Sequence, residues 1–506
     1  MILIYPPVAK SCEPPAGLAK LAGTLRQHGI NHTILDANLE GMLSLLNSTR
    51  TESIAASDRW TLRAMRNITK NLTALRHPEI YRSIDRYQRA VADVNRALEK
   101  SVADSKLTLS LANYQHSTLS PIRSADLLSA AEHPEPNPFY PYFSQKFREL
   151  IEQTQPAIIG FSLTYLSQAL CTFAMLGFLR REYPSIKLIC GGGLVTSWLR
   201  RPGWSNPFTS LIDHFIDGPG EQELLKLAGM DKREDIQSAP DYSSLPLNEY
   251  LAPGLILPYS GSSGCFWNKC SFCPEKSEAN IYVPIGPEKA ASELSSLVEQ
   301  IQPVLIHLLD NSVSPALLKT LIKHPPGAPW YGFARIGKEL IDPDFCMELK
   351  RSGCVMLKLG IESGDQAVLD RLQKGIDLDI ASAVLKALKQ AGIATYVYLL
   401  FGTPAETLES ARKTLDFTVQ HADQIGFLNL ALFNMPVGSP EAKELGTGSF
   451  YEGDLSLYTG FSHPAGWDRK QVRQFIENEF RRHPAVSAIL KKDPPFFTSN
   501  HAPFFI

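Results

Sequence analysis

Short apolar runs alternate with stretches of helical spacing in the first part of the chain, a pattern typical of parallel α/β structure. The first unit pairs an apolar run at Ile2–Tyr5 with a helical stretch from Leu18 to Leu25. After a long break the same alternation returns, and residues 1–230 are therefore predicted to form a Rossmann-like, doubly wound domain. The candidate strands are Ile2–Tyr5, Thr33–Leu35, Ala157–Ser162, Lys187–Cys190 and His214–Ile216.

Two regions interrupt or end this domain. Residues from about 41 to 145 are rich in Ser, Thr, Asn, Arg and Leu, and parts of them have helical spacing, so we predict a mostly helical insertion. Residues 231–255 are polar and carry Pro240, Pro246 and Pro253. That composition favours a linker.

A second α/β series begins at about residue 256. Its six short apolar runs are separated by segments of helical spacing, which predicts a partial, TIM-like (β/α)6 barrel over residues 256–440. We expect a small, mainly helical extension over residues 441–506. The candidate strands are Ile256–Pro258, Leu305–Leu308, Trp330–Ala334, Met356–Ile361, Thr395–Leu400 and Phe427–Leu432.

Composition and charge narrow the class of protein. Hydrophobic residues make up 44% of the 506 residues and charged residues 20%, as in ordinary globular proteins. A net charge of −2 gives no reason to expect a nucleic-acid partner. No apolar run reaches the roughly 18 residues that span a bilayer. The first residues contain no basic segment of a signal peptide, so a cytoplasmic location is expected.

Three of the eight cysteines, Cys265, Cys270 and Cys273, lie in one loop directly after a candidate strand. Such a cluster points to metal binding in a reducing compartment. A four-iron cluster held by three thiolates keeps one iron free for a small molecule. A structural zinc site takes four ligands and would need a remote one such as His307. Count and spacing leave both alternatives open.

The segment Gly261-Ser-Ser-Gly-Cys265-Phe-Trp-Asn-Lys-Cys270-Ser-Phe-Cys273 resembles the cluster loop of the radical S-adenosylmethionine (SAM) enzymes, although their usual spacing is Cys-x3-Cys-x2-Cys. A variant with one more residue occurs in the cobalamin-binding branch of that family. The resemblance implies that the three cysteines hold a [4Fe-4S] cluster. It also implies that SAM binds the open iron, and that one electron cleaves SAM to a 5′-deoxyadenosyl radical. An electron donor such as flavodoxin or ferredoxin would be a partner.

Further matches follow at the ends of the candidate barrel strands, where barrel enzymes place their chemistry. The Leu-Asp-Asn-Ser segment at 309–312, the Gly-Ile-Glu-Ser segment at 360–363 and the Gly-Thr-Pro-Ala-Glu-Thr turn at 402–407 resemble SAM-binding segments of this family. Taken singly, each acidic residue here is better explained by helix capping, and their shared order after a cysteine loop is what favours the resemblance. The resemblance implies catalytic roles for Arg335 and Glu362. It implies SAM contacts for Phe272, Asp310, Asn311, Ser312, Glu362, Ser363, Gly402 and Glu406.

The N-terminal domain has glycine-rich turns after its strands, where open parallel sheets bind ligands. Packing turns without a ligand explain the glycines equally well. The pattern resembles the cobalamin-binding domain of the same family, except that Asn38 stands where many members have a cobalt-ligating histidine. Either cobalamin binds without that histidine or only the fold has been kept. The implied cobalamin contacts are Asn38, Ser162, Thr164, Gly191, Gly192, Gly193, Gly220 and Glu221.

These resemblances imply a cobalamin-dependent radical SAM enzyme, with methylation of an unactivated carbon as the leading hypothesis. A radical cyclase or rearrangement enzyme without methyl transfer is the alternative among enzymes. A non-catalytic zinc- or cluster-binding protein is the alternative outside them. The substrate class, a small molecule or a peptide, is not fixed by the sequence.

Overall fold

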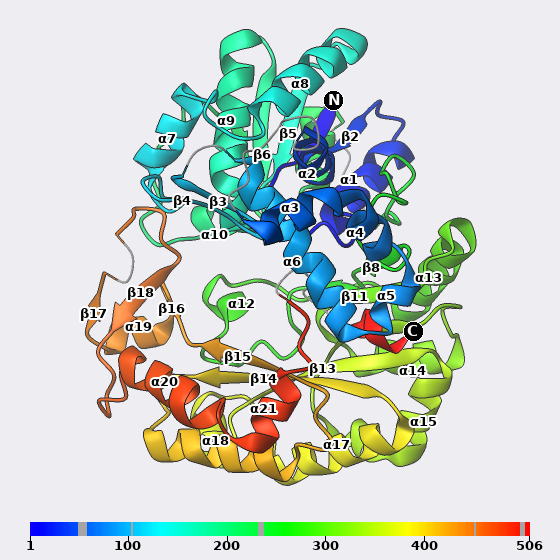
Figure 1. Cartoon of the computed structure of the whole chain (residues 1–506), viewed down its shortest axis with the longest axis vertical. Helices are drawn as coiled ribbons and strands as arrows, with labels where there is room; N and C mark the ends of the chain where they lie inside the picture. Colours follow the sequence, from blue (N-terminus) through cyan, green and yellow to red (C-terminus); the bar gives the residue numbers. More distant parts are fainter. Residues whose placement is uncertain (49–57, 103–104, 231–236, 450–451, 496–500) are drawn as a thin grey trace. The chain divides into compact units, whose positions relative to one another are not determined.

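The computed structural model describes residues 1–48, 58–102, 105–230, 237–449, 452–495 and 501–506. The chain divides into two compact units (Figure 1). The first comprises residues 1–255 with 452–457 and 495–499, and the second comprises 256–451, 458–494 and 500–506. Parts of the predicted insertion and linker, at 49–57, 103–104 and 231–236, lie outside the described residues.

The first unit is built on a five-stranded parallel sheet with the order β2-β1-β5-β6-β7. This is the doubly wound order in which the chain reverses direction beside β1, so that β1 and β5 flank the switch point. All five strands lie within a residue or two of their predicted positions. Nearly every residue of β1 and β5 is apolar and buried, which is the pattern of strands covered on both faces of a parallel sheet. The strands are β1 Ile2–Tyr5, β2 Thr33–Asp36, β5 Ile158–Ser162, β6 Lys187–Gly191 and β7 His214–Phe215.

Helices pack on this sheet and on one another. The most deeply buried is α9, whose residues from Gln168 to Leu179 are all buried. Gly177 allows the backbone of α7 to approach α9, since a Cβ at this position would lie 1.8 Å from the Ala131 carbonyl oxygen. The helices are α1 Ala16–Gln27, α7 Ser124–Glu132, α8 Tyr140–Thr154, α9 Leu166–Glu182, α10 Gly193–Leu199 and α11 Glu221–Leu227.

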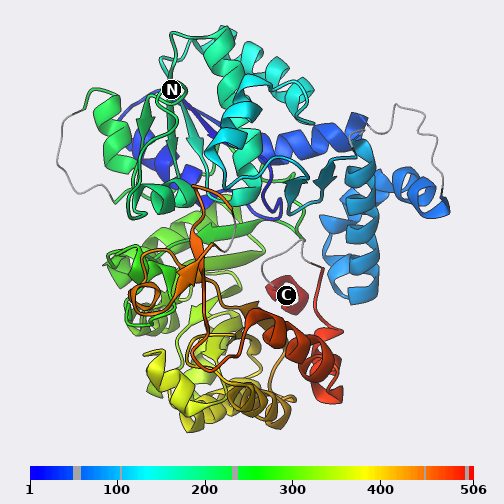
Figure 2. The same cartoon turned by 90° about the vertical axis from the view of Figure 1, so that its left-hand side faces the viewer.

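The insertion is mostly helical, as predicted, but it also contains an antiparallel hairpin that the sequence pattern did not indicate. Figure 2 shows its helices in blue at the right of the view. The strands of the hairpin have only three residues each, too few for a clear alternation of polar and apolar positions. The elements are α2 Ala37–Ser48, α3 Arg59–Arg66, α4 Ile68–Leu75, α5 Pro78–Tyr81, α6 Ile84–Ser101, β3 Leu107–Leu109 and β4 Tyr114–His116.

The described part of the predicted linker, residues 237–255, does not behave as a free connection. It packs onto the first unit, where the buried Tyr250 donates a hydrogen bond of 2.7 Å to Asp36 and Asp241 pairs with Arg26 at 3.0 Å. The prolines suggested a linker, but the aromatic residues between them supply enough apolar surface for packing.

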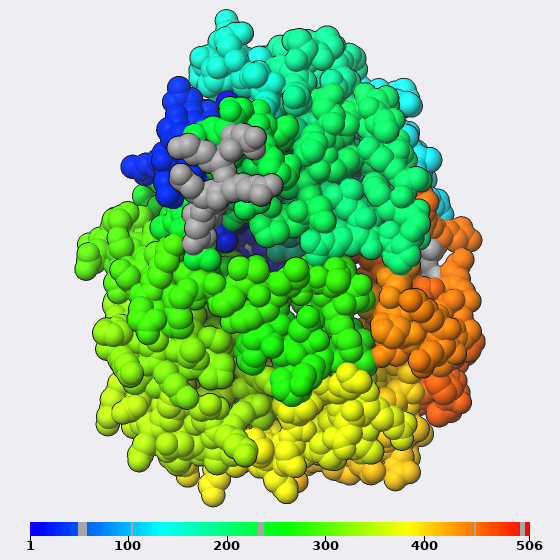
Figure 3. Space-filling view, turned by 180° about the vertical axis from the view of Figure 1, so that it is seen from behind, coloured from blue at the N-terminus to red at the C-terminus, as the bar shows by residue number. Residues whose placement is uncertain are grey.

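The second unit contains a six-stranded parallel sheet with the order β15-β14-β13-β12-β11-β8, which is the chain order. The partial barrel fold is thus confirmed. In the space-filling view the visible surface of the second unit passes from green through yellow to orange, so segments that follow one another in the sequence lie side by side on this face (Figure 3). The strands are β8 Ile256–Tyr259, β11 Leu305–Val313, β12 Trp330–Ala334, β13 Cys354–Glu362, β14 Ala394–Phe401 and β15 Phe427–Leu432.

Helices between the barrel strands begin and end at recognisable signals. The side chain of Asp377 accepts hydrogen bonds from the first turn of α17, which ends at Gly392 in the left-handed conformation. Ser314 and Thr407 cap α14 and α18 in the same way. The helices are α12 Pro274–Ser277, α13 Pro287–Ile301, α14 Pro315–Lys323, η1 Lys338–Ile341, α15 Pro343–Arg351, α16 Gln366–Arg371, α17 Leu378–Ala391 and α18 Leu408–Gln420.

The C-terminal region has helices but also a small antiparallel sheet, β16-β18-β17, that was not anticipated. Its strands have two to four residues and give no periodic signal. None of the described helices is long and apolar enough to cross a membrane. The elements are β16 Met435–Pro436, β17 Thr447–Gly448, β18 Tyr458–Phe461, α19 Pro440–Glu444, α20 Arg469–Phe475, a π-helix Ile476–Phe480, α21 Pro484–Leu490 and η3 Ala502–Phe505.

Candidate active site

The three clustered cysteines lie in the loop that follows β8. Two short strands, β9 (Ser262–Ser263) and β10 (Val283–Pro284), pair antiparallel and close the base of this loop. Gly264 is required at the base, because its φ is +70° and a Cβ would lie 2.5 Å from the Ile281 carbonyl oxygen. The cysteine loop therefore has a fixed entry and exit.

The end of β11 fastens the same loop. Asp310 is buried and accepts hydrogen bonds from the Gly261 amide at 3.0 Å and the Ser262 hydroxyl at 2.5 Å. Burial raises the pKa of Asp310, and both bonds oppose that rise. Asn311 donates to the Gly264 carbonyl at 3.2 Å. The register between β11 and β12 shifts at this point, so these residues turn out of the regular ladder.

A second fastening joins the cysteine loop to residues 372–375, directly after α16. The Trp267 indole donates to the Gln373 carbonyl at 3.1 Å. The guanidinium of Arg335, which follows β12, lies 3.7 Å above the centre of the Trp267 ring and donates to the Gly375 carbonyl at 2.8 Å. Arg335 also bonds the Lys374 carbonyl. The edge of Trp267 occupies the space where a Cβ of Gly375 would be.

Glu362 stands at the end of β13 in the left-handed conformation, with φ of +69°. Its carboxylate forms an ion pair of 2.8 Å with Lys374, and both side chains are largely shielded from solvent. The Lys374 ammonium lies 5.7 Å from the centre of the Phe272 ring. Two cations, Arg335 and Lys374, thus stand close to the cysteine loop.

The three cysteines are free thiols of intermediate exposure. Burial raises the pKa of Cys273 to about 11. Burial also raises the pKa of Cys270, although the charges of Lys374 and Arg335 oppose that rise. Binding to a metal centre would supply the remaining stabilisation that the thiolates need.

In the described structure, His307 does not come together with the three cysteines as a fourth zinc ligand. Within the described parts of the chain, no three His, Cys, Asp or Glu side chains converge on one metal position. His307 lies on β11, buried, with its Nε2 atom 3.1 Å from the Lys358 ammonium and its ring stacked on Tyr331. Thiols spread around a larger iron–sulfur cube need not converge on one point, so the cluster interpretation is retained.

The turn after β14 is organised by a buried carboxyl group. Glu406 accepts hydrogen bonds from the Gly402 amide at 2.5 Å and the Trp467 indole at 3.0 Å. Burial raises the pKa of Glu406 to about 7. One of its two oxygens has no hydrogen-bond partner among the described residues, and the same holds for the buried hydroxyl of Ser312.

The residues predicted from the sequence to form the site of this unit have different roles in the structure. Phe272 is part of the cysteine loop, and Arg335 and Glu362 lie beside it. Asp310 and Asn311 form hydrogen bonds that hold the loop in place. Ser363 is buried and bonded to Thr414, so its hydroxyl braces the barrel. Sequence reasoning missed Lys374 and Gly375, for which a Lys-Gly pair after a helix was a weak signal. Trp467 is one of the C-terminal aromatic residues for which ordinary packing was favoured over a place at the barrel mouth, and it is buried against Glu406.

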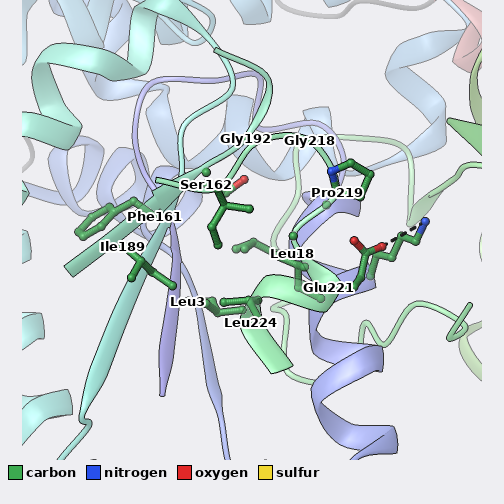
Figure 4. Close-up of a pocket in the computed structure, with 17 residues that line it drawn as sticks. Leu3, Leu18, Phe161, Ser162, Ile189, Gly192, Gly218, Pro219, Glu221 and Leu224 are labelled. Carbon is green, nitrogen blue, oxygen red and sulfur yellow. Dashed lines mark ion pairs between the residues drawn. The ribbon is translucent and has the colours of Figure 1, made fainter. Parts of the chain in front are cut away.

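A cavity of about 250 Å3 lies in the first unit, at the carboxyl edge of its sheet (Figure 4). Its lining is apolar and unusually rich in glycine, and the ion pair of Lys20 with Glu221, at 3.3 Å, lies on its wall. Five of the predicted cobalamin residues line it: Ser162, Gly191, Gly192, Gly220 and Glu221. The other wall residues include Leu3, Gly17, Leu18, Gly160, Ile189, Gly218 and Leu224.

Three predicted residues do not line this cavity. Asn38 is buried and fastens the loop after β1, because its side chain accepts from the Ala9 amide at 2.8 Å and donates to the Ser11 hydroxyl at 3.2 Å. The backbone amide of Thr164 donates to Gln168 at 2.9 Å, and Gly193 begins α10. These residues shape the turns around the cavity.

A cysteine loop held at the carboxyl edge of a partial barrel is the arrangement expected from the resemblance to radical SAM enzymes. Residues 259–418 match the sequence model of the radical SAM superfamily, so the barrel of the second unit is a radical SAM domain. This class implies a [4Fe-4S] cluster and SAM. The match covers most of the barrel and the whole cysteine loop.

Two curated relatives are distant. The chain is 26% identical over 249 residues to an anaerobic magnesium-protoporphyrin IX monomethyl ester cyclase of Rubrivivax gelatinosus, covering 48% of this chain. It is 23% identical over 308 residues to an uncharacterised methyltransferase of Pyrococcus horikoshii, covering 53% of this chain. The chain spans 43% and 65%, respectively, of the lengths of these two relatives.

Solved structures share the architecture of both units. The radical SAM methyltransferase TsrM from Kitasatospora setae, with cobalamin and a [4Fe-4S] cluster bound, matches with a TM-score of 0.53 at 14% identity, over 88% of this chain and 74% of TsrM. The cobalamin-dependent radical enzyme OxsB matches with a TM-score of 0.53 at 13% identity, over 82% of each chain. At such identities the likeness concerns the fold.

Proposed function

We propose that this chain is a cobalamin-dependent radical SAM enzyme that methylates an unactivated carbon of a small molecule or a peptide. The observation that carries the proposal is the combination of two features in one chain. One is the fastened three-thiol loop of the second unit, and the other is the glycine-lined cavity of the first.

The residues around the loop suit a [4Fe-4S] cluster and SAM. Cys265, Cys270 and Cys273 would hold the cluster, which supplies one-electron cleavage of SAM when both are bound. The buried hydroxyl of Ser312, which has no hydrogen-bond partner in the described parts of the chain, offers a hydrogen bond at the barrel edge. Arg335 and Lys374 place positive charge beside Cys270, where it opposes protonation of the thiolate.

The cavity of the first unit suits part of a cobalamin. Its apolar wall of leucines and glycines accepts a flat ring system, and the Ser162 hydroxyl is available at its edge. A Cβ at Gly17 would meet nothing within 4 Å, so a side chain at this position would enter open space. A volume of about 250 Å3 holds only a part of so large a cofactor, and the rest would extend beyond the carboxyl edge of the sheet.

A radical cyclase or rearrangement enzyme is the second candidate. The observation that favours it is the relation to the protoporphyrin ester cyclase, which has a higher identity to this chain than the Pyrococcus methyltransferase has. Both candidates use the same cysteine loop and cleave SAM in the same way, so they differ only in the later fate of the substrate radical.

Anaerobic reconstitution tests the proposal. Purified protein is loaded with iron, sulfide and hydroxocobalamin, and then given SAM and a reductant such as reduced flavodoxin or ferredoxin. We expect about four irons per chain, bound cobalamin, 5′-deoxyadenosine and S-adenosylhomocysteine. Deoxyadenosine without S-adenosylhomocysteine or bound cobalamin favours the second candidate. A colourless protein that holds zinc would contradict both.

The cysteines supply the matched controls. Changing Cys265, Cys270 or Cys273 to alanine should abolish the cluster and the formation of deoxyadenosine. Cys190→Ala changes a fully buried thiol on β6 of the first unit and should leave the iron content unchanged.

A further inference from the structure

The helical insertion concentrates positive charge that the chain as a whole lacks. Residues 58–101 contain ten Arg and Lys against five Asp and Glu, whereas the net charge of all 506 residues is −2. Helices α3 to α6 account for this stretch, and α6 packs against each of the other three (Figure 1). A basic cluster on an otherwise weakly acidic chain attracts an anionic partner.

The charge lines a groove. A cavity of about 940 Å3 lies among α3 to α6 within the first unit. Thr69, Lys70 and Asn71 border it from α4, and Arg86 and Arg89 border it from α6. It is far larger than the cavity at the edge of the sheet.

Of the Arg and Lys side chains that line this groove, Arg63 pairs with the lining carboxylate of Asp93, whereas the other three are not neutralised by the described acidic residues. Lys70, Arg86 and Arg89 are exposed, and no carboxylate of the described residues lies within ion-pair distance of any of them. Both acidic groups that line the groove are already engaged. Asp93 accepts from Trp60 at 2.9 Å and Arg63 at 3.0 Å, and Glu79 pairs with Arg82 at 2.8 Å.

Apolar side chains lie between the charges. Ile80 and Ala90 line the groove and are almost fully buried, and Ala74 lies beside them. A bare phosphate would need a compact cradle of converging donors. These cations stand on two separate helices along an open space with an apolar floor.

We propose that the groove among α3 to α6 binds an extended acidic peptide segment, with apolar residues interleaved among its carboxylates. This proposal does not depend on the catalytic one.

Fluorescence anisotropy with the full chain tests it. The probe is a fluorescein-labelled peptide of about twelve residues in which Glu alternates with Ala and Leu, and its Gln analogue is the neutral control. We expect micromolar binding of the Glu peptide that weakens as salt rises from about 50 to 300 mM, because screening reduces exposed charge interactions. The Gln analogue should bind at least about tenfold more weakly.

A matched pair of variants locates the site. The triple variant K70E/R86E/R89E should lose about tenfold or more in affinity. The variant R59E/R66E/K386E makes the same change in net charge at exposed residues that do not line the groove, and it should bind almost as tightly as the parent. Equal losses in both variants, or no binding by the parent, would overturn the proposal. So would displacement of the Glu peptide by inorganic tripolyphosphate at a lower concentration than by unlabelled peptide, since the groove would then be a phosphate site.

Discussion

The guanidinium of Arg335 lies 3.7 Å above the ring of Trp267, two positions beyond the first cysteine of the loop. The ammonium of Lys269 lies 4.8 Å from the centre of the same ring. Cation–π contacts of this kind contribute about 0.5–2 kcal/mol each, depending on how far they are shielded from water. Trp267 thus ties the cysteine loop to the end of β12.

We expect Arg335→Ala to weaken cluster retention about tenfold, the scale typical of residues that support metal ligands. The change removes the stack on Trp267, the hydrogen bond to Gly375 and a positive charge near Cys270. The measurement is the rate at which a chelator removes iron from the anaerobically reconstituted protein. The control is Lys338→Ala, which removes an exposed charge from the segment after the same strand. Equal rates in the two variants would show that Arg335 does not support the loop.

Gly375→Ala should prevent normal docking of the cysteine loop. A Cβ at this position would lie 2.1 Å from the Trp267 ring, in a residue whose φ is already +62°. We expect reconstituted protein with less than about half of the parental iron content. Gly392→Ala is the matched control, because its φ is +69° but nothing lies within 4 Å of the added Cβ. It should cost about 1 kcal/mol of stability and keep the cluster.

Glu406→Gln should make the protein more stable above neutral pH. The pKa of this carboxyl is raised from 4.5 to about 7, so the folded protein holds a proton that the unfolded chain releases. Stability therefore falls as pH rises from about 4.5 to about 7 and stays lower above that range. The glutamine oxygen can accept the same two hydrogen bonds and removes the ionisation.

The expected gain in the free energy of unfolding at pH 8 is about 2–3 kcal/mol, with almost no difference from the parent at pH 4.5. Urea unfolding followed by tryptophan fluorescence at both pH values measures it. Glu409→Gln, at an exposed position of the adjacent helix α18, should show no such pH dependence. A gain of equal size at both pH values would exclude ionisation of Glu406 as its cause.

Gly17→Leu should block cobalamin binding without unfolding the first unit. The new side chain would extend into the cavity from α1, where leucine favours the helix by about 0.5–1 kcal/mol over glycine. We expect affinity for hydroxocobalamin to fall at least about tenfold, measured by absorbance after gel filtration. Gly286→Leu also enters open space, but in the second unit, and should bind cobalamin normally. Unchanged affinity of the Gly17 variant would place the cofactor elsewhere.

Much of the fold can be predicted directly from local pattern. Strands such as β1 and β14 are short apolar runs bounded by turn residues, and their positions were predicted to within a residue or two. The hairpin β3–β4 and the small C-terminal sheet were missed because their strands are too short for periodicity to register. Their pairing depends on surrounding structure.

The site divides in a similar way. Cys265, Cys270 and Cys273 are close in sequence, so their spacing alone predicts a shared centre. Lys374 reaches this loop from about a hundred residues further along the chain, and only the folded barrel brings it there. Asn38 was placed with the cofactor by its position in a motif, whereas its hydrogen bonds hold a loop.

The anchors of the cysteine loop also set an order of events during synthesis. Gly261, Gly264 and Trp267 are held by Asp310, Asn311 and residues 373–375, all of which are translated after the cysteines. When the three cysteines have just left the ribosome, the residues that hold the cysteine loop in place have therefore not yet been synthesised. The loop then has no defined conformation in which to bind iron. We expect loading of the metal to wait until synthesis has passed Gly375 and the middle barrel strands have paired.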